Sequence, residues 1–106
     1  MCALKTIREL CDAGAKAHGA GDPLNGDFLL QQAYAQARGL NSPVLEAKIL
    51  NTMGVFALEG KRAKKAVPLL SEAREKVRKR IGTQNKLYEV ICSNLLQAQV
   101  ASVTAG

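Results

Sequence analysis

Apolar residues recur every three or four positions along most of this chain, which is the spacing typical of amphipathic helices. Glycine, proline and asparagine separate the apolar stretches. Short links make sequential helices antiparallel neighbours, so the pattern predicts an all-α fold of antiparallel helix hairpins. About five helices are expected, at residues 3–18, 27–39, 43–59, 62–80 and 84–103.

Two of the predicted helix starts follow from capping residues. Asp27 is expected to begin the second helix after a loop at residues 19–26, because aspartate is a good N-cap or first-turn residue. Ser42 is expected to cap the third helix. Pro43 then takes its first position, where the missing N–H costs nothing.

The composition fits one small helical domain spanning residues 1–106. Hydrophobic residues make up 47% of the chain, enough to fill a core, and aromatic residues only 4%. Alanine and leucine are the main apolar residues, and alanine is the best helix former.

Gly54 lies in the middle of the third predicted helix, where a glycine costs about 1 kcal/mol relative to alanine. We expect it to let two helices cross closely, with Ala66 and Ala73 as small partners. The alternative is a chance weak position in a generic bundle. Internal overlays support a repeat: Gly14 on Gly54 at an offset of 40, Asn51 on Asn94 at 43, and Leu30 on Ala66 at 36.

These spacings resemble the tetratricopeptide repeat, most closely its longer kinesin-light-chain type. The pattern is carried by Leu50-x2-Met53-Gly54-x2-Ala57, then Ala66-x3-Leu70, then Ala73. The aromatic positions are aliphatic here, and no proline follows the second helix. The resemblance implies a right-handed superhelical array with repeats at about 3–40 and 43–81 and a half repeat at about 84–103.

The resemblance also implies a protein–protein interaction module, an adaptor or scaffold without catalytic activity. A peptide or partner helix would lie on the concave face of the first, third and fifth helices. Asn51 and Asn94 would grip its backbone, since an amide both donates and accepts hydrogen bonds. Alternatively, the two are exposed polar residues or a local link between helices. The remaining groove candidates are Lys48, Arg8, Val55 and Leu58.

The net charge of +6 is concentrated in residues 61–80, where nine Lys and Arg face two Glu. A nucleic-acid-binding helical domain is therefore the alternative function, because clustered cations neutralise phosphates. An acidic membrane surface, an acidic protein partner or a solvated outer face would also explain the cluster. The basic patch consists of Arg74, Lys76, Arg78, Lys79 and Arg80.

Few residues suggest catalysis, a cofactor or a metal. His18 is the only histidine, and three cysteines lack metal-ligand spacing, so we expect no metal site and no cofactor. His18 is expected to be a solvated residue at a helix end, the less favoured alternative being a phosphotransfer histidine in a small bundle. Cys11 and Cys92 are expected to pack rather than react.

No stretch has the roughly 20 apolar residues of a membrane helix, and no secretory leader is recognisable. Together with the unpaired cysteines, this predicts a cytoplasmic location. The fifth helix has no partner helix in the pattern. Its unpaired face is expected to stay partly exposed, with Val90, Ile91, Leu95 and Val100 as candidates. The helix packs across the bundle, self-associates or belongs to a longer array, and the last two are favoured.

Overall fold

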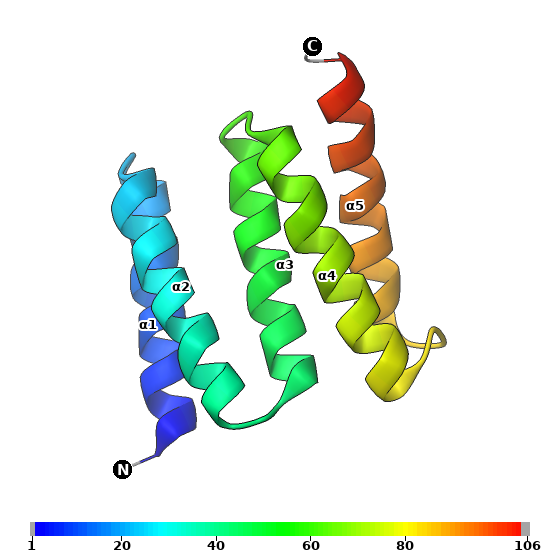
Figure 1. Cartoon of the computed structure of the whole chain (residues 1–106). Coiled ribbons are helices and arrows are strands. Elements are labelled where there is room, and N and C mark those ends of the chain that lie inside the picture. Colours follow the sequence, from blue (N-terminus) through cyan, green and yellow to red (C-terminus); the bar gives the residue numbers. More distant parts are fainter. Residues whose placement is uncertain (1, 105–106) are drawn as a thin grey trace. The chain divides into compact units, whose positions relative to one another are not determined.

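The structure, a computed structural model that describes residues 2–104, is built from helices alone (Figure 1). Helix packs against helix within each hairpin, so the predicted all-α class is confirmed for the part of the chain described. The five helices are α1 (Ala3–Gly19), α2 (Pro23–Gly39), α3 (Pro43–Glu59), α4 (Ala63–Ile81) and α5 (Lys86–Thr104).

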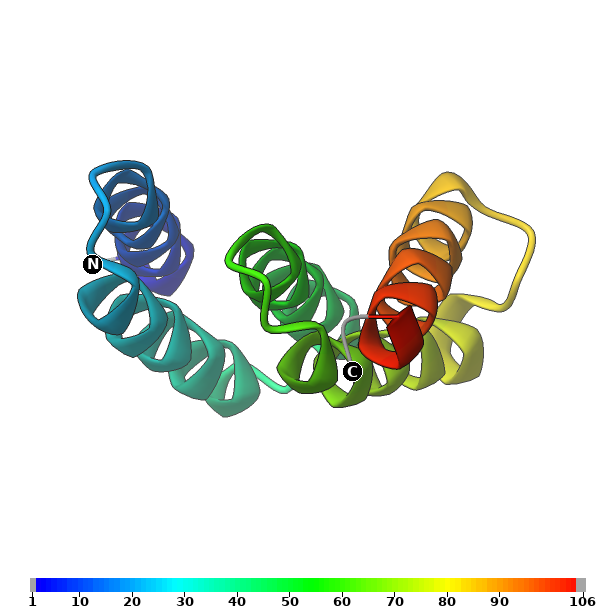
Figure 2. The ribbon, with the colours of Figure 1, turned by 90° about the horizontal axis from the view of Figure 1, so that it is seen from above.

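The chain divides into two compact units, Met1–Ser42 and Pro43–Gly106. In the first unit α1 packs against α2. In the second unit α4 packs against both α3 and α5, and α3 also contacts α5 (Figure 2). The single domain and the tetratricopeptide-like repeat boundaries stay predictions.

The start of α2 differs from the sequence-based expectation. Asp22 caps this helix, accepting a hydrogen bond from the backbone N–H of Asn25 at 3.2 Å, and Pro23 takes the first helical position. The predicted start at Asp27 and the predicted loop at 19–26 are therefore wrong. Asp22 and Pro23 thus begin α2 in the way that Ser42 and Pro43 are expected to begin the third helix, with a capping residue followed by a proline. Proline suits this position because it has no N–H to leave unpaired.

Gly54 is needed because a leucine lies directly over it. A Cβ added to Gly54 would lie 2.6 Å from Cγ of Leu70, closer than real side chains approach. The predicted close crossing of α3 and α4 is thus confirmed. Its partner is the large, fully buried Leu70, whereas the sequence pointed to Ala66 and Ala73, one turn to either side.

The first hairpin contains the same contact forty residues earlier. A Cβ on Gly14 would lie 2.9 Å from Cγ of Leu30, which is also fully buried. Leu30 is therefore equivalent to Leu70, and the expected offset of 36 between α2 and α4 is wrong. The error equals one helical turn, which leaves the apolar face almost unchanged and so escapes detection by periodicity.

The turns inside the two hairpins also repeat. The N–H of Asp22 donates to the Ala17 carbonyl at 2.9 Å, and that of Arg62 to the Ala57 carbonyl at 2.8 Å. This hydrogen bond joins residues five apart and satisfies a carbonyl at the helix end. It requires a residue in the left-handed conformation just before the donor. Positive φ angles occur there, 81° at Gly21 and 61° at Lys61.

The core of the second unit joins all three of its helices. Leu58 of α3 and Val67 of α4 pack at its edge, half-buried. Ile91 and Leu95 of α5 are buried, so the expectation that they lie on an exposed face is wrong. The buried cluster consists of Ala57, Ala66, Leu70, Leu95 and Ala98.

Candidate functional site

The two groove asparagines contact each other. The side-chain amide of Asn94 donates a hydrogen bond to Oδ1 of Asn51 over 3.0 Å, and both residues are half-buried. They lie at the same level because α5 begins 43 residues after α3, the offset that separates the two asparagines. The structure thus shows a local link between α3 and α5, while their grip on a peptide stays a prediction.

The other groove candidates on α3 share a face with Asn51. Lys48, Asn51, Val55 and Leu58 are spaced by three, four and three residues, which aligns them along one side of a helix. Lys48 is exposed, and Val55 and Leu58 are half-buried. Arg8 lies in the first unit, exposed on α1. The second unit therefore holds a surface of mixed apolar and polar character beside the amide pair.

A surface hollow adjoins this face on α5. Its volume is about 300 Å³, and Asn94 belongs both to its wall and to the amide pair. The hollow gives room for a group that reaches the amides. Its lining residues are Lys86, Glu89, Val90, Ser93 and Asn94.

Lys76 of the basic patch is held in an ionic cluster. Its Nζ lies 3.0 Å from Oε1 of Glu46 and 3.7 Å from Oε2 of Glu72. Glu46 is buried, and a buried carboxylate needs such a partner. Lys76 therefore ties α4 to α3, and its charge is largely neutralised.

Arg78 is also paired, with Glu75 one turn before it. Its Nε and Nη2 donate to the two carboxylate oxygens at 3.2 and 2.8 Å. The hydrogen bond from Arg78 is the main cause of the lowered pKa of Glu75. Lys79 and Arg80 are exposed, and Arg74 is half-buried.

A hollow of about 490 Å³ lies over this part of α4. Acidic and basic side chains alternate around it, so the surface carries mixed charge rather than a continuous positive field. Such a surface attracts phosphates less than the sequence count suggests. The lining residues are Pro43, Glu72, Glu75, Lys76, Lys79 and Arg80.

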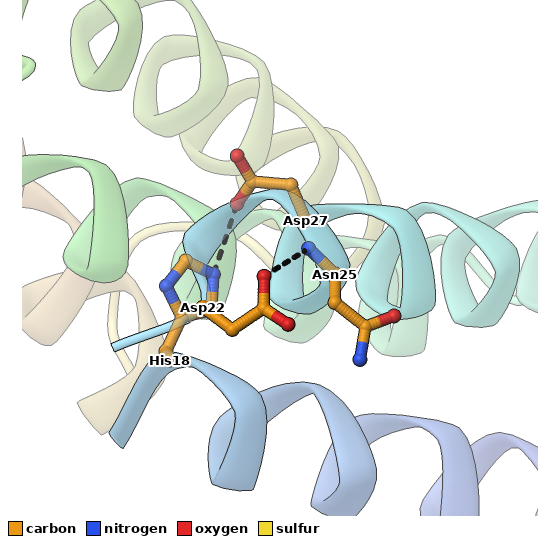
Figure 3. A network of polar contacts seen from close by, with 4 residues as sticks. All are labelled: His18, Asp22, Asn25 and Asp27. Atoms are coloured by element: carbon orange, nitrogen blue, oxygen red, sulfur yellow. Dashed lines mark hydrogen bonds and ion pairs between the residues drawn. The ribbon is translucent and has the colours of Figure 1, made fainter. Parts of the chain in front are cut away.

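His18 is buried, which contradicts the expectation of a solvated helix end. Its side chain is only 7% exposed, and Nε2 lies 2.9 Å from Oδ1 of Asp27, itself 18% exposed (Figure 3). The ring covers the backbone of Gly26, where an added Cβ would lie 2.3 Å from ring atom Cδ2. The pair links the end of α1 to the first turns of α2.

The cysteines differ in their surroundings. Cys11 is half-buried, and burial, followed by the charge of Asp12, raises the pKa of its thiol, so at neutral pH it is the less reactive thiol form. Cys92 is half-buried on α5, where its interaction with Tyr88 is the main cause of the raised pKa of that tyrosine. Cys2 is exposed. Cys11 and Cys92 thus have the partial burial expected of packing residues.

Two polar pairs, His18–Asp27 and Glu46–Lys76, are absent from the sequence-based expectations. The first follows from the correct start of α2. With a turn of only three residues between α1 and α2, His18 and Asp27 lie near the same end of the hairpin. The Glu46–Lys76 pair has a weaker signal in the sequence, which is the single glutamate, Glu46, within the apolar face of α3.

No family model matches the chain, and no curated protein or solved structure matches it either. The protein class that fold and site define is thus an all-α protein of packed helix hairpins. None of the described helices is long and apolar enough to cross a bilayer. Among residues 2–104, no three His, Cys, Asp or Glu side chains gather where they could hold a metal ion.

Proposed function

We propose that this protein is a tetratricopeptide-like interaction module, an adaptor that acts by binding in the cytoplasm rather than by catalysis. A peptide or a partner helix occupies the surface formed by α3 and α5. Support comes from the repeated hairpins, which place successive first helices side by side in the second unit. Two such helices offer a longer contact surface than one.

The Asn51–Asn94 pair is the observation that carries this proposal. Its single hydrogen bond uses one N–H of Asn94 and the oxygen of Asn51. The chemistry of two amides leaves the amino group of Asn51 as a donor and the oxygen of Asn94 as an acceptor. One residue of an extended peptide presents its N–H and its carbonyl on the same side, so it matches this arrangement whatever its side chain. Lys48, Val55 and Leu58 would then contact the ligand's side chains.

The ion pairs on α4 favour this surface over the basic patch. Lys76 and Arg78 are engaged by Glu46, Glu72 and Glu75, which removes part of the charge that a nucleic acid would bind. Self-association through α5 is a second part of the proposal.

The test is capture of partners from source-cell lysate by the full chain, with and without nuclease, followed by titration of each recovered partner. Asn51→Ala with Asn94→Ala should weaken a nuclease-resistant partner by about tenfold or more, since each lost hydrogen bond is worth about 0.5–1.5 kcal/mol. Asn25→Ala is the matched control, because it removes an exposed amide from α2.

A triple change of Arg74, Lys79 and Arg80 to Gln separates the two surfaces. Under the proposal this variant keeps the partner. Recovery that disappears with nuclease or with the triple variant, and ignores the asparagines, would move the function to the basic patch. Thermal unfolding followed by circular dichroism shows whether each variant remains folded.

A further inference from the structure

One face of α5 leaves large apolar side chains in water. The side chains are 62%, 55% and 80% exposed, and their spacing of four and three residues puts them in one row. At 100° per residue, this row is on the side of α5 opposite its buried residues. The row, called here the α5 stripe, consists of Leu96, Val100 and Val103.

The α5 stripe corresponds to the side of α3 that receives α4. At the offset of 43, Val100 is equivalent to Ala57 and Gln97 to Gly54, both buried in the α3–α4 hairpin. The side chain of Gln97 takes up the space that a leucine fills over Gly54. A helix cannot therefore approach α5 as closely as α4 approaches α3, and a repeat of that hairpin is a poor fit.

The charge of this surface favours a second copy of the same chain. Residues 90–104 contain no charged side chain, although 23% of the whole chain is charged. Two copies of the α5 stripe therefore meet without opposing like charges. Gln97 and Gln99 flank the stripe, and amides can pair with identical amides because each donates and accepts.

We propose that two copies of this protein associate through antiparallel α5 helices, with the two-fold axis at Val100. A two-fold contact is self-complementary, so Val100 meets Val100 of the partner subunit. The same geometry brings Leu96 beside Val103 of the partner subunit, one residue from the position directly opposite. The inference rests on the self-association part of the proposed function and is independent of the peptide surface.

The contact is small, so the dimer is weak. Three apolar side chains per copy cover less than the standard interface, and a dissociation constant of about 10 μM to 1 mM is expected. Each copy carries a net charge of +6, and this repulsion opposes association. Salt screens it, so the dimer strengthens as salt is added, whereas association through ion pairs would weaken.

Sedimentation equilibrium of the purified full chain over that concentration range tests the proposal. Val100→Glu and Val100→Lys each place like charges at the two-fold axis and should weaken the dimer at least about a hundredfold. An equimolar mixture of the two variants restores association, because Glu then meets Lys. Leu24→Glu is the matched control, as Leu24 is 83% exposed on α2.

Three results would each overturn the proposal. The wild-type chain could stay monomeric throughout the range, or the Val100 variants could associate as it does. Both variants could also be monomeric without recovery in the mixture, which excludes the two-fold contact at Val100. Circular dichroism confirms that the variants are helical. Partner capture through Asn51 and Asn94 uses other residues, so its outcome is separate from this one.

Discussion

The α1–α2 hairpin and the α3–α4 hairpin bury the same glycine–leucine contact, yet each contains a polar pair that the other lacks. His18 and Asp27 are bonded in the first hairpin. Forty residues later the equivalent positions hold Leu58 and Val67, which pack at the edge of the apolar core. The same place in the fold is therefore polar in one hairpin and apolar in the other.

The opposite arrangement occurs at the other end of the hairpins. Glu46 and Lys76 form an ion pair in the second hairpin. Their equivalents in the first are Thr6 and Gln36, both uncharged. Each hairpin thus has a polar pair that the other lacks, at a different level along its axis.

This difference indicates how similar helices choose their partners. The glycine–leucine contact is nearly the same in both hairpins, so it would also form between α1 and α4 or between α3 and α2. Those pairings would set His18 against Val67, or Asp27 against Leu58, and leave a buried polar group without its partner, which costs about 1–3 kcal/mol. We infer that the polar pairs select the correct hairpins, while the leucines supply most of the stability.

The largest expected effect comes from the shared contact. Leu70→Ala removes a fully buried side chain and should lower the free energy of unfolding by about 2–5 kcal/mol. Gly54→Ala should then cost less in the Leu70→Ala variant than in the wild type, because the atoms that meet the new Cβ are gone. Urea unfolding followed by circular dichroism measures each step.

Leu24→Ala is the control for that series, since the side chain is exposed and the change should alter stability little. Leu30→Ala with Gly14→Ala repeats the cycle in the first hairpin. The coupling between leucine and glycine should have the same sign there. Additive effects in both hairpins would contradict the shared contact.

A middle-sized effect is expected from converting the first polar pair into its apolar equivalent. Asp27→Val alone removes the bond to a buried His18 and should destabilise the chain by about 1–3 kcal/mol. Adding His18→Leu should recover that loss and can exceed wild-type stability, because replacing both partners of a buried hydrogen bond with apolar groups is often neutral or stabilising. The measured quantities are the free energy of unfolding and its dependence on urea.

The urea dependence addresses partner choice. If the pair selects the hairpin, the double variant keeps its stability but unfolds with a smaller m-value, because mispaired states are populated. A double variant that is as stable and as cooperative as the wild type would show that the pair adds no specificity.

The sequence predicts the helices well because each contains its own apolar face. Helix α3 is an example: Ser42, Pro43 and Gly60 mark its ends, and the structure places it at Pro43–Glu59. The close crossing at Gly54 is predicted as well, since a central helix glycine needs a packing reason. These features depend on residues adjacent in sequence or one turn apart.

The errors concern positions that periodicity cannot fix. Moving the start or the alignment of α2 by one turn leaves the same residues on its apolar face. The apolar pattern is therefore compatible with the wrong offset of 36 and the wrong loop at 19–26. The His18–Asp27 contact depends on that start and is lost with it. The sequence offset of 43 shows that Asn51 and Asn94 are equivalent. Their hydrogen bond is visible only in the packed structure of α3 and α5. Whether a peptide binds there depends on a partner that the chain does not specify.

The smallest expected effect is at the turns, where the two hairpins use different residues at the same left-handed position. Lys61 has a φ of 61°, which costs a non-glycine residue about 1 kcal/mol, whereas its equivalent Gly21 adopts its φ of 81° freely. Gly21→Lys should therefore destabilise the chain by less than about 1 kcal/mol, because losing the glycine also restricts the unfolded chain. Lys61→Gly is the reverse change at the equivalent turn, so it should stabilise the chain by a similar small amount. Urea unfolding of the two variants gives both values. Equal and opposite changes would mean that the backbone decides both results. A destabilised Lys61→Gly would mean that the side chain of Lys61, or the added freedom of the unfolded chain, outweighs the strain relieved at the second turn.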